Sequence, residues 1–178
     1  MQRVIILDRD GVINEDSDDY IKSPAEFIPI PGSLEAIVRL SEAGWRVLVA
    51  TNQSGVARGL YDLATLQEIH AKLHKLLKPM GGQIEAIFYC PHAPDDDCAC
   101  RKPKPGLLHS IAEQFQITLQ GVPTVGDSLR DLQAAQAVGA TPILVRTGKG
   151  ERTLAEGTGL AGIPVYANLA AVVDALLT

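Results

Sequence analysis

Acidic side chains stand at the ends of two strand-like runs, where together they could hold a cation. Asp8 and Asp10 follow the aliphatic run at residues 4–7, and Asp127 ends a later run. Residues two apart on a strand point to the same side, so we expect Asp8 and Asp10 to face one volume that Asp127 can join. Such acids repel one another unless a cation lies between them, and oxygen ligands favour Mg²⁺, which binds phosphate. Asp-x-Asp alone more often caps a turn, but Asp127 and Lys102 at matching positions favour a functional site.

Two further groups suit an anion. Thr51 ends a strand-like run and offers a hydroxyl, and the residues after it can present backbone N–H groups. Lys102 lies in an Arg-Lys-Pro-Lys-Pro-Gly segment, whose prolines restrict the backbone and can hold the cation in place. Each signal is weak alone, because Thr is common at strand ends and a basic loop is often only solvated. Lys102 lies ahead of a predicted helix, which favours a fixed phosphate contact.

All three cysteines of the chain fall between residues 90 and 100. Cys90, His92, Cys98 and Cys100 offer three thiolates and one imidazole, which is a full tetrahedral set for Zn²⁺. A site with four protein ligands is closed, so we expect a structural zinc that fixes a loop and places Arg101 and Lys102. The alternative is a redox-active dithiol.

The elements that must position these residues alternate between strand and helix. Strands are expected at residues 4–7, 45–50, 84–89, 122–125, 142–145 and 164–166. Helices are expected at 33–44, 62–81, 107–115, 128–139 and from residue 168 onward. This alternation predicts a Rossmann-like three-layer α/β/α sandwich with a central parallel sheet, whose ligands bind beyond the carboxyl ends of the strands. We expect one domain over residues 1–178, a zinc-binding loop at about 90–100 and no separate cap domain.

Composition excludes several classes of protein. The 178 residues are 46% hydrophobic and 21% charged with a net charge of −5, which is typical of a folded domain and argues against non-specific nucleic-acid binding. No apolar run is long enough for a membrane span, and the first residues do not resemble a secretory signal. We therefore expect a cytoplasmic protein whose cysteines are free thiols or metal ligands.

Four motifs follow one another along essentially the whole chain, namely Asp8-Arg9-Asp10-Gly11-Val12, Thr51, Lys102 and Gly126-Asp127. This ordered set resembles the haloacid dehalogenase superfamily of phosphotransferases. Within it, the chain is similar to the phosphatases that remove the 7-phosphate of D-glycero-D-manno-heptose 1,7-bisphosphate. The shared features are the Asp-Arg-Asp-Gly opening, the Thr-Asn-Gln-Ser-Gly block, and Cys-Pro-His followed by Cys-x-Cys-Arg-Lys-Pro.

The resemblance implies a Mg²⁺-dependent phosphatase that works through an aspartyl-phosphate. Asp8 would be the nucleophile, and Asp10 would protonate the leaving oxygen and then deprotonate the hydrolytic water. Mg²⁺ would be held by the side chains of Asp8 and Asp127 and by the backbone carbonyl of Asp10. Thr51 and Lys102 would stabilise charge on the phosphoryl oxygens.

The resemblance also implies substrate contacts. Arg101 would recognise the substrate, and the pocket would be lined by Asn52, Gln53, Ser54 and, more loosely, Asp16, Ser17, Asp18 and Asp19. Two features depart from the family pattern: the loop at residues 16–20 is more acidic and one residue longer, and Ser128 stands where some relatives have Lys.

The implied setting is the synthesis of nucleotide-activated heptose such as ADP-heptose, which feeds lipopolysaccharide. Three alternatives stay open. One is a histidinol-phosphatase of the same superfamily, a second is a polynucleotide 3′-phosphatase, which the acidic balance disfavours, and a third is a phospho-accepting receiver module, which Asp-x-Asp with a zinc loop does not fit well. We expect a monomer that acts on a small sugar phosphate, with no nucleic-acid or membrane partner.

Overall fold

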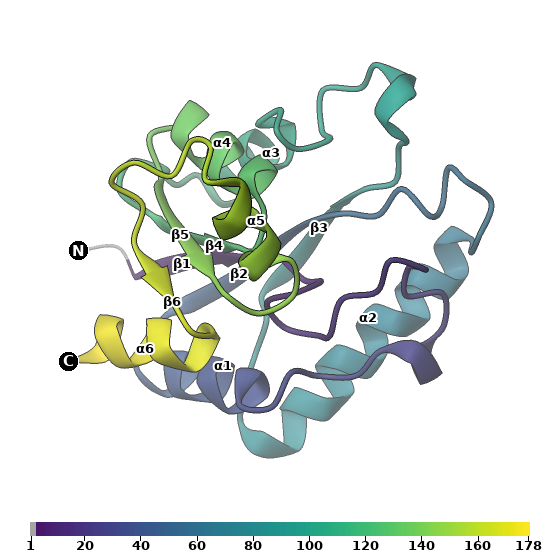
Figure 1. Ribbon diagram of the computed structural model, residues 1–178. Helices are drawn as coiled ribbons and strands as arrows, with labels where there is room; N and C mark the ends of the chain where they lie inside the picture. Colours follow the sequence, from purple (N-terminus) through teal and green to yellow (C-terminus); the bar gives the residue numbers. More distant parts are fainter. Residues whose placement is uncertain (1–2) are drawn as a thin grey trace.

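The computed structural model describes residues 3–178, and within them a parallel sheet of six strands forms the centre of the molecule (Figure 1). In chain order the strands are β1 (Val4–Leu7), β2 (Arg46–Asn52), β3 (Ala86–Cys90), β4 (Pro123–Gly126), β5 (Thr141–Val145) and β6 (Val165–Tyr166). Across the sheet their order is β3-β2-β1-β4-β5-β6. Every neighbouring pair is parallel, so all six carboxyl ends meet at one edge of the sheet.

Helices cover both faces of the sheet and make it the middle layer of three. They are α1 (Ser33–Glu42), α2 (Leu63–Leu77), α3 (Gly106–Phe115), α4 (Leu129–Ala137), α5 (Gly150–Glu156) and α6 (Leu169–Leu177). In Figure 1, α1, α2 and α6 lie below the sheet, and α3 and α4 lie above it. Short 3₁₀ turns occupy Pro24–Glu26, Lys78–Met80 and Pro94–Asp96.

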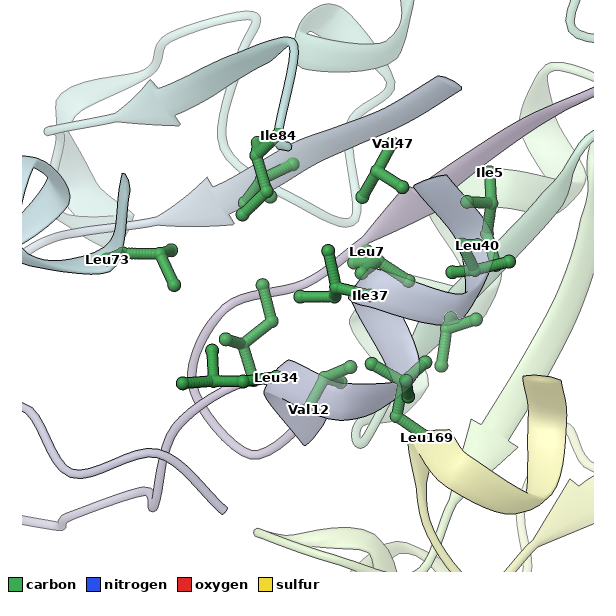
Figure 2. Close-up of a cluster of buried hydrophobic side chains, with 14 of the residues drawn as sticks. Ile5, Leu7, Val12, Leu34, Ile37, Leu40, Val47, Leu73, Ile84 and Leu169 are labelled. Carbon is green, nitrogen blue, oxygen red and sulfur yellow. The ribbon is translucent and has the colours of Figure 1, made fainter. Parts of the chain in front are cut away.

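The hydrophobic core is divided by the sheet into two clusters. Figure 2 shows the lower one, in which Ile5 and Leu7 of β1 pack against Ile37 and Leu40 of α1 and Leu169 of α6. The intervening residues of β1, Val4 and Ile6, point to the other cluster, beneath α3 and α4. Because β1 is buried on both faces, its sequence is a continuous aliphatic run rather than an alternating one.

The strand order reverses at β1, which places a binding crevice beside this strand. From β1 the chain steps outward through β2 and β3, then returns to β4 on the other side of β1 and continues to β5 and β6. The backbone N–H of Asp8 donates to the carbonyl of Val125 at 2.9 Å, so the ends of β1 and β4 are in direct contact. In open parallel sheets, ligands bind at such a reversal, outside the carboxyl ends of the strands.

The predicted fold class is confirmed, and the predicted strands and helices are present within about two residues of their expected bounds, except that α2 ends at Leu77 and a 3₁₀ turn occupies Lys78–Met80. Asp62 and Asn168 cap α2 and α6, where their side chains accept from the N–H groups of Thr65 and Ala171. The sequence pattern does not predict α5, because this segment has no repeating apolar stripe. Among residues 3–178, no separate cap domain covers the sheet edge, and no helix has the length and apolarity needed to cross a membrane.

Candidate active site

Three carboxylates meet at the crevice between β1 and β4. Asp8 follows β1, Asp127 follows β4, and Asp131 lies in the first turn of α4. Each offers an oxygen within 4.8 Å of the others. As the sequence predicted, Asp10 lines one cavity together with Asp8 and Asp127. The sequence argument did not include Asp131, which supplies the third carboxylate of the close group.

Lys102 enters this group of acids from the loop after β3 and is almost fully buried. Its ammonium donates to Asp8 Oδ1 at 3.2 Å, to Asp131 Oδ1 at 2.8 Å and to the carbonyl of Ala50 at 2.6 Å. The side-chain amide of Asn52 fixes the Lys102 backbone: its oxygen accepts from the Lys102 N–H at 3.0 Å and its nitrogen donates to the Lys102 carbonyl at 3.3 Å. Asn52 thus holds Lys102 in addition to lining the cavity.

The charges of this group are unbalanced in a way that suits a cation. Burial and the charge of Asp131 raise the pKa of Asp8, although Lys102 opposes the shift. Burial, Asp8 and Asp131 likewise raise the pKa of Asp127. Burial opposes the charge on Lys102, but Asp131 and Asp8 outweigh it and raise its pKa above the usual range. The three carboxylates of Asp8, Asp127 and Asp131 share one ammonium, so their ionised forms leave an excess of negative charge. A divalent cation with oxygen ligands would neutralise that excess.

Asp127 is held by two loops that approach it closely. Its Oδ2 accepts from the backbone N–H of Lys149 at 2.8 Å, and its carbonyl accepts from the hydroxyl of Thr153 in α5 at 2.8 Å. On the other side lies Gly11, with φ of 87°. A Cβ on Gly11 would collide with Asp127 Oδ2, so both the backbone conformation and the close approach require glycine after Asp10.

Asp10 also borders the cavity, but its carboxylate is held by hydrogen-bond donors from three residues. Its Oδ1 accepts from Arg9 Nε at 3.1 Å, Arg9 Nη2 at 2.8 Å and Asn14 Nδ2 at 2.9 Å, and its Oδ2 accepts from Gln53 Nε2 at 3.0 Å. Burial opposes ionisation of Asp10, but the Arg9 guanidinium and these hydrogen bonds outweigh it and lower the pKa. The resting form of Asp10 is therefore a carboxylate.

Arg9 is itself fully buried, although its neighbours Asp8 and Asp10 border the cavity. Its Nη1 lies 3.1 Å from Nε2 of His70 on α2. A guanidinium only donates, so His70 must accept at Nε2 and carry its proton on the other nitrogen. Burial, followed by the Arg9 charge, lowers the pKa of His70 to about 3, which keeps this imidazole neutral. This buried contact joins α2 to the loop after β1.

A cavity of about 470 Å³ opens above Asp8, Asp10 and Asp127. Its lining includes Asn52, Gln53, Ser54 and four cationic side chains, those of Arg58, Arg101, Arg130 and Lys149. Burial and the nearby guanidiniums of Arg130 and Arg58 lower the pKa of Arg101, which shows that three like charges gather here. Within residues 3–178, none of these three arginines forms an ion pair, so the cluster is suited to an anion.

The acidic loop at residues 16–20 borders the same cavity. Asp16, Ser17 and Asp18 line it, whereas Asp19 is exposed and outside the lining. Asp16 lies 3.5 Å from the Lys149 ammonium, and Asp18 lies 3.7 Å from the Arg152 guanidinium. Ser128 also lines the cavity, and its hydroxyl donates to Asp131 at 3.0 Å.

Thr51 is buried at the end of β2 and lies outside the residues that line the cavity. Its hydroxyl accepts from Gln53 Nε2 at 3.0 Å. The same amide nitrogen donates to Asp10, so Gln53 joins Thr51 to Asp10.

The predicted zinc ligands come together next to the cavity. Cys90 Sγ lies 3.4 Å from His92 Nδ1 and 3.6 Å from Cys98 Sγ, and His92 Nδ1 lies 3.3 Å from Cys100 Sγ. A tetrahedral Zn²⁺ with Zn–S of about 2.3 Å separates its ligand atoms by roughly 3.5–3.8 Å. The four side chains therefore fit zinc. The segment between Cys90 and Cys100 contains only one short 3₁₀ turn, so a bound metal would supply order that secondary structure does not.

Sequence reasoning missed several residues of this site. Asp131 had a usable signal, since it lies four residues after Asp127 at the start of a helix and can face the same crevice. Arg58, Arg130 and Lys149 had none, because isolated surface cations are common. The contact of Arg9 with His70 depends on how α2 packs beside the loop after β1, which no local pattern indicates.

Two family models match the chain. The model described as polynucleotide kinase 3 phosphatase matches residues 2–132, and the HAD-hydrolase-like model matches residues 99–172. Together they span the motifs from Asp8 to Asp127.

Curated relatives match nearly the full length. The D-glycero-beta-D-manno-heptose-1,7-bisphosphate 7-phosphatase of Bordetella bronchiseptica is 59% identical over 175 residues, covering 98% of this chain and 98% of the relative. The enzyme of the same name from Pseudomonas putida is 58% identical over 175 residues, covering 98% of this chain and 99% of the relative.

A solved structure is similar in backbone as well. The crystal structure of D,D-heptose 1,7-bisphosphate phosphatase from B. bronchiseptica, complexed with magnesium and phosphate, superposes with a TM-score of 0.96 at 59% identity, covering 99% of this chain and 98% of that one.

Proposed function

Because this chain belongs to the haloacid dehalogenase superfamily of phosphatases, and within it to the family of heptose-1,7-bisphosphate 7-phosphatases, we propose that it removes the 7-phosphate of D-glycero-D-manno-heptose 1,7-bisphosphate. It is a hydrolase of phosphoric monoesters. The observation that carries the proposal is the meeting of Asp8, Asp127 and Lys102 at the β1–β4 crevice.

In the proposed reaction Asp8 is the nucleophile. A carboxylate oxygen of Asp8 attacks phosphorus, the bond from phosphorus to the sugar oxygen breaks, and an aspartyl-phosphate forms. Lys102 contacts Asp8 Oδ1 at 3.2 Å, and together with Thr51 it would offset charge on the phosphoryl oxygens. Covalent catalysis divides one difficult displacement into two steps, which explains why a second acid stands beside the first.

Asp10 is the proposed acid and base. A phosphoryl group beside it places negative charge next to the carboxylate, which raises the pKa of Asp10 and favours the protonated form that the first step requires. Its proton passes to the departing sugar oxygen. In the second step Asp10 takes a proton from water, the water oxygen attacks phosphorus, and the bond to Asp8 breaks to release inorganic phosphate.

The donor set at the crevice fits Mg²⁺. The side chains of Asp8 and Asp127 and the backbone carbonyl of Asp10 would hold it, while Asp131 is engaged by Lys102 and Ser128. Such an ion, when bound, neutralises charge on the phosphoryl group and orients it for displacement. The relative crystallised with magnesium and phosphate supports this assignment.

The cavity also offers a place for the second phosphate of a bisphosphate. Arg101, with Arg58 and Arg130 nearby, has no carboxylate partner within residues 3–178, and these guanidiniums can bind phosphate oxygens in pairs. A sugar held in this way would present its 7-phosphate to Asp8. The proposed cellular setting is the synthesis of ADP-heptose for lipopolysaccharide.

Zinc at Cys90, His92, Cys98 and Cys100 is proposed to be structural, because four protein ligands leave no open position for substrate. Cys98→Ser should lower the zinc content and the melting temperature, and reduce activity only through the loop that carries Arg101 and Lys102. Metal analysis of protein purified without added zinc, together with thermal unfolding, measures both. Unchanged melting of the variant, or well below one equivalent of zinc in the wild type, would contradict this role.

The family model for polynucleotide kinase 3 phosphatase, matched at residues 2–132, favours a second candidate substrate. The test is a phosphate-release assay with heptose 1,7-bisphosphate, histidinol phosphate and an oligonucleotide 3′-phosphate, each with and without Mg²⁺. We expect Mg²⁺-dependent turnover with the largest kcat/KM for the heptose bisphosphate. A larger value for the oligonucleotide or for histidinol phosphate would overturn the proposed substrate.

A further inference from the structure

A buried tyrosine outside the cavity lining reaches the site through a single glutamine. Tyr61 lies just before α2, and its hydroxyl donates to Gln53 Oε1 at 2.6 Å. The Nε2 of that amide donates to Asp10 Oδ2 and to Thr51 Oγ1, both at 3.0 Å. Tyr61 and Gln53 are 8% and 3% exposed, so water does not compete freely for these bonds.

The amide of Gln53 can form these three hydrogen bonds in only one orientation. Both hydrogens of its NH₂ group are used, one toward the proposed acid–base carboxylate and one toward the proposed phosphoryl-stabilising hydroxyl. Rotating the amide by half a turn would place Oε1 against Asp10 and remove a donor from Thr51. Within residues 3–178, the side chain that donates to Oε1 is Tyr61, and this hydrogen bond selects the observed orientation of the amide.

The ring of Tyr61 is held by close packing. A Cβ on Gly55 would collide with ring atom Cε1, so the loop after β2 needs glycine to let the ring approach. Burial raises the pKa of Tyr61 to about 12, so its hydroxyl keeps its proton and stays a donor across the working range of pH.

We propose that Tyr61 is a positioning residue that fixes the amide of Gln53 and thereby aligns Asp10 and Thr51 with each other. The inference rests on the proposed function, because it takes Asp10 as the acid and base and Thr51 as a phosphoryl contact. Since Tyr61 lies outside the residues that line the cavity, it should act on the chemical step and leave the binding of the sugar phosphate nearly unchanged.

The test is a double-mutant cycle with Tyr61→Phe and Gln53→Met. Tyr61→Phe keeps the ring against Gly55 and removes only the hydroxyl, and we expect kcat to fall about tenfold with KM within about twofold of the wild type. In the Gln53→Met background, adding Tyr61→Phe should cause no further loss, because Tyr61 then has no amide to hold. Tyr166→Phe, which removes a phenol hydroxyl from half-buried β6, is the matched control and should leave both parameters unchanged.

Three outcomes would overturn the inference: an unchanged kcat in Tyr61→Phe, a loss that appears in KM alone, or equal losses in the two backgrounds. Thermal unfolding of each variant under the assay conditions confirms that the folded protein is being compared. Failure of the proposed substrate is recognised separately, since the wild type would then hydrolyse an aryl phosphate but not the heptose bisphosphate. The same cycle is in that case measured on the aryl phosphate.

Discussion

Asp8 and Asp10 are two residues apart, yet their surroundings are opposite in kind. Around Asp8 the chain gathers the like charges of Asp131, Asp10 and Asp127, and the single cation Lys102 is shared with Asp131. The carboxylate of Asp10 instead accepts hydrogen bonds from Arg9, Asn14 and Gln53, and Arg9 adds a positive charge. The first environment disfavours the ionised carboxylate and the second favours it.

This difference indicates a division of labour between two chemically identical groups. A site that pushes the pKa values of two carboxylates apart assigns them different roles. The buried carboxylates around Asp8 repel one another, and bound Mg²⁺ would relieve this repulsion. The shell of Asp10 is complete without ligand, which fixes the orientation of the acid–base group before substrate arrives.

The largest expected effect separates the two carboxylates by stability as well as by activity. Asp8→Asn removes the nucleophile, so turnover should fall by more than about 10⁵-fold. The same change removes a like charge from the buried group, so the melting temperature of Mg²⁺-free protein should rise. Phosphate release and thermal unfolding in Mg²⁺-free buffer that retains zinc measure both. Activity near that of the wild type would remove Asp8 as nucleophile, and a lower melting temperature would contradict the account of its surroundings.

Asp10→Asn is the matched change at Asp10, and it should lower the stability that Asp8→Asn is expected to raise. Turnover should fall by about 10²–10⁴-fold, because the acid and base is lost. The buried Arg9 guanidinium would lose its carboxylate partner, so the free energy of unfolding should fall by about 3 kcal/mol. Denaturant unfolding of the two variants side by side gives the comparison directly. Equal shifts of the same sign would show that the two environments do not differ as described.

The contrast between these environments was only partly predictable from the sequence. The parallel-sheet rule brings the residues after each strand to one edge, which is why Asp8, Thr51, Lys102 and Asp127 could be predicted to converge. Strand alternation also predicted that Asp10 faces the same cavity as Asp8, which it does, but it did not indicate that Asp131 completes the close group of carboxylates.

The contacts of the supporting residues could not be predicted because they depend on tertiary packing. The spacing from Asp127 indicates that Asp131 can face the crevice, but its ion pair needs Lys102, which arrives on a separate loop after β3. Tyr61 and His70 reach Asp10 only through Gln53 and Arg9, once α2 lies beside the loop after β1. α5 carries no apolar stripe, although its hydroxyl at Thr153 holds the carbonyl of Asp127.

The smallest expected effect tests the outermost contact of the Asp10 environment. Burial and the charge of Arg9 lower the pKa of His70 from 6.5 to about 3, so in this window the unfolded chain binds a proton that the folded chain does not. His70 therefore contributes stability that is fully present above pH 6.5 and is lost as the pH falls toward 3, by at most about 1.4 kcal/mol for each pH unit.

His70→Gln keeps an acceptor for Arg9 but cannot titrate, so the difference in unfolding free energy between wild type and variant should change with pH between 6.5 and 4. The other groups that face His70, namely Asp10, His74 and the Tyr89 ring, are common to both proteins and cancel in this difference. His109→Gln, an exposed change on α3, is the control and should follow the wild-type profile. Parallel profiles for wild type and His70→Gln would mean that His70 is protonated in the fold. That result is incompatible with a guanidinium donating to its Nε2, and it would contradict the contact from His70 through Arg9 to Asp10.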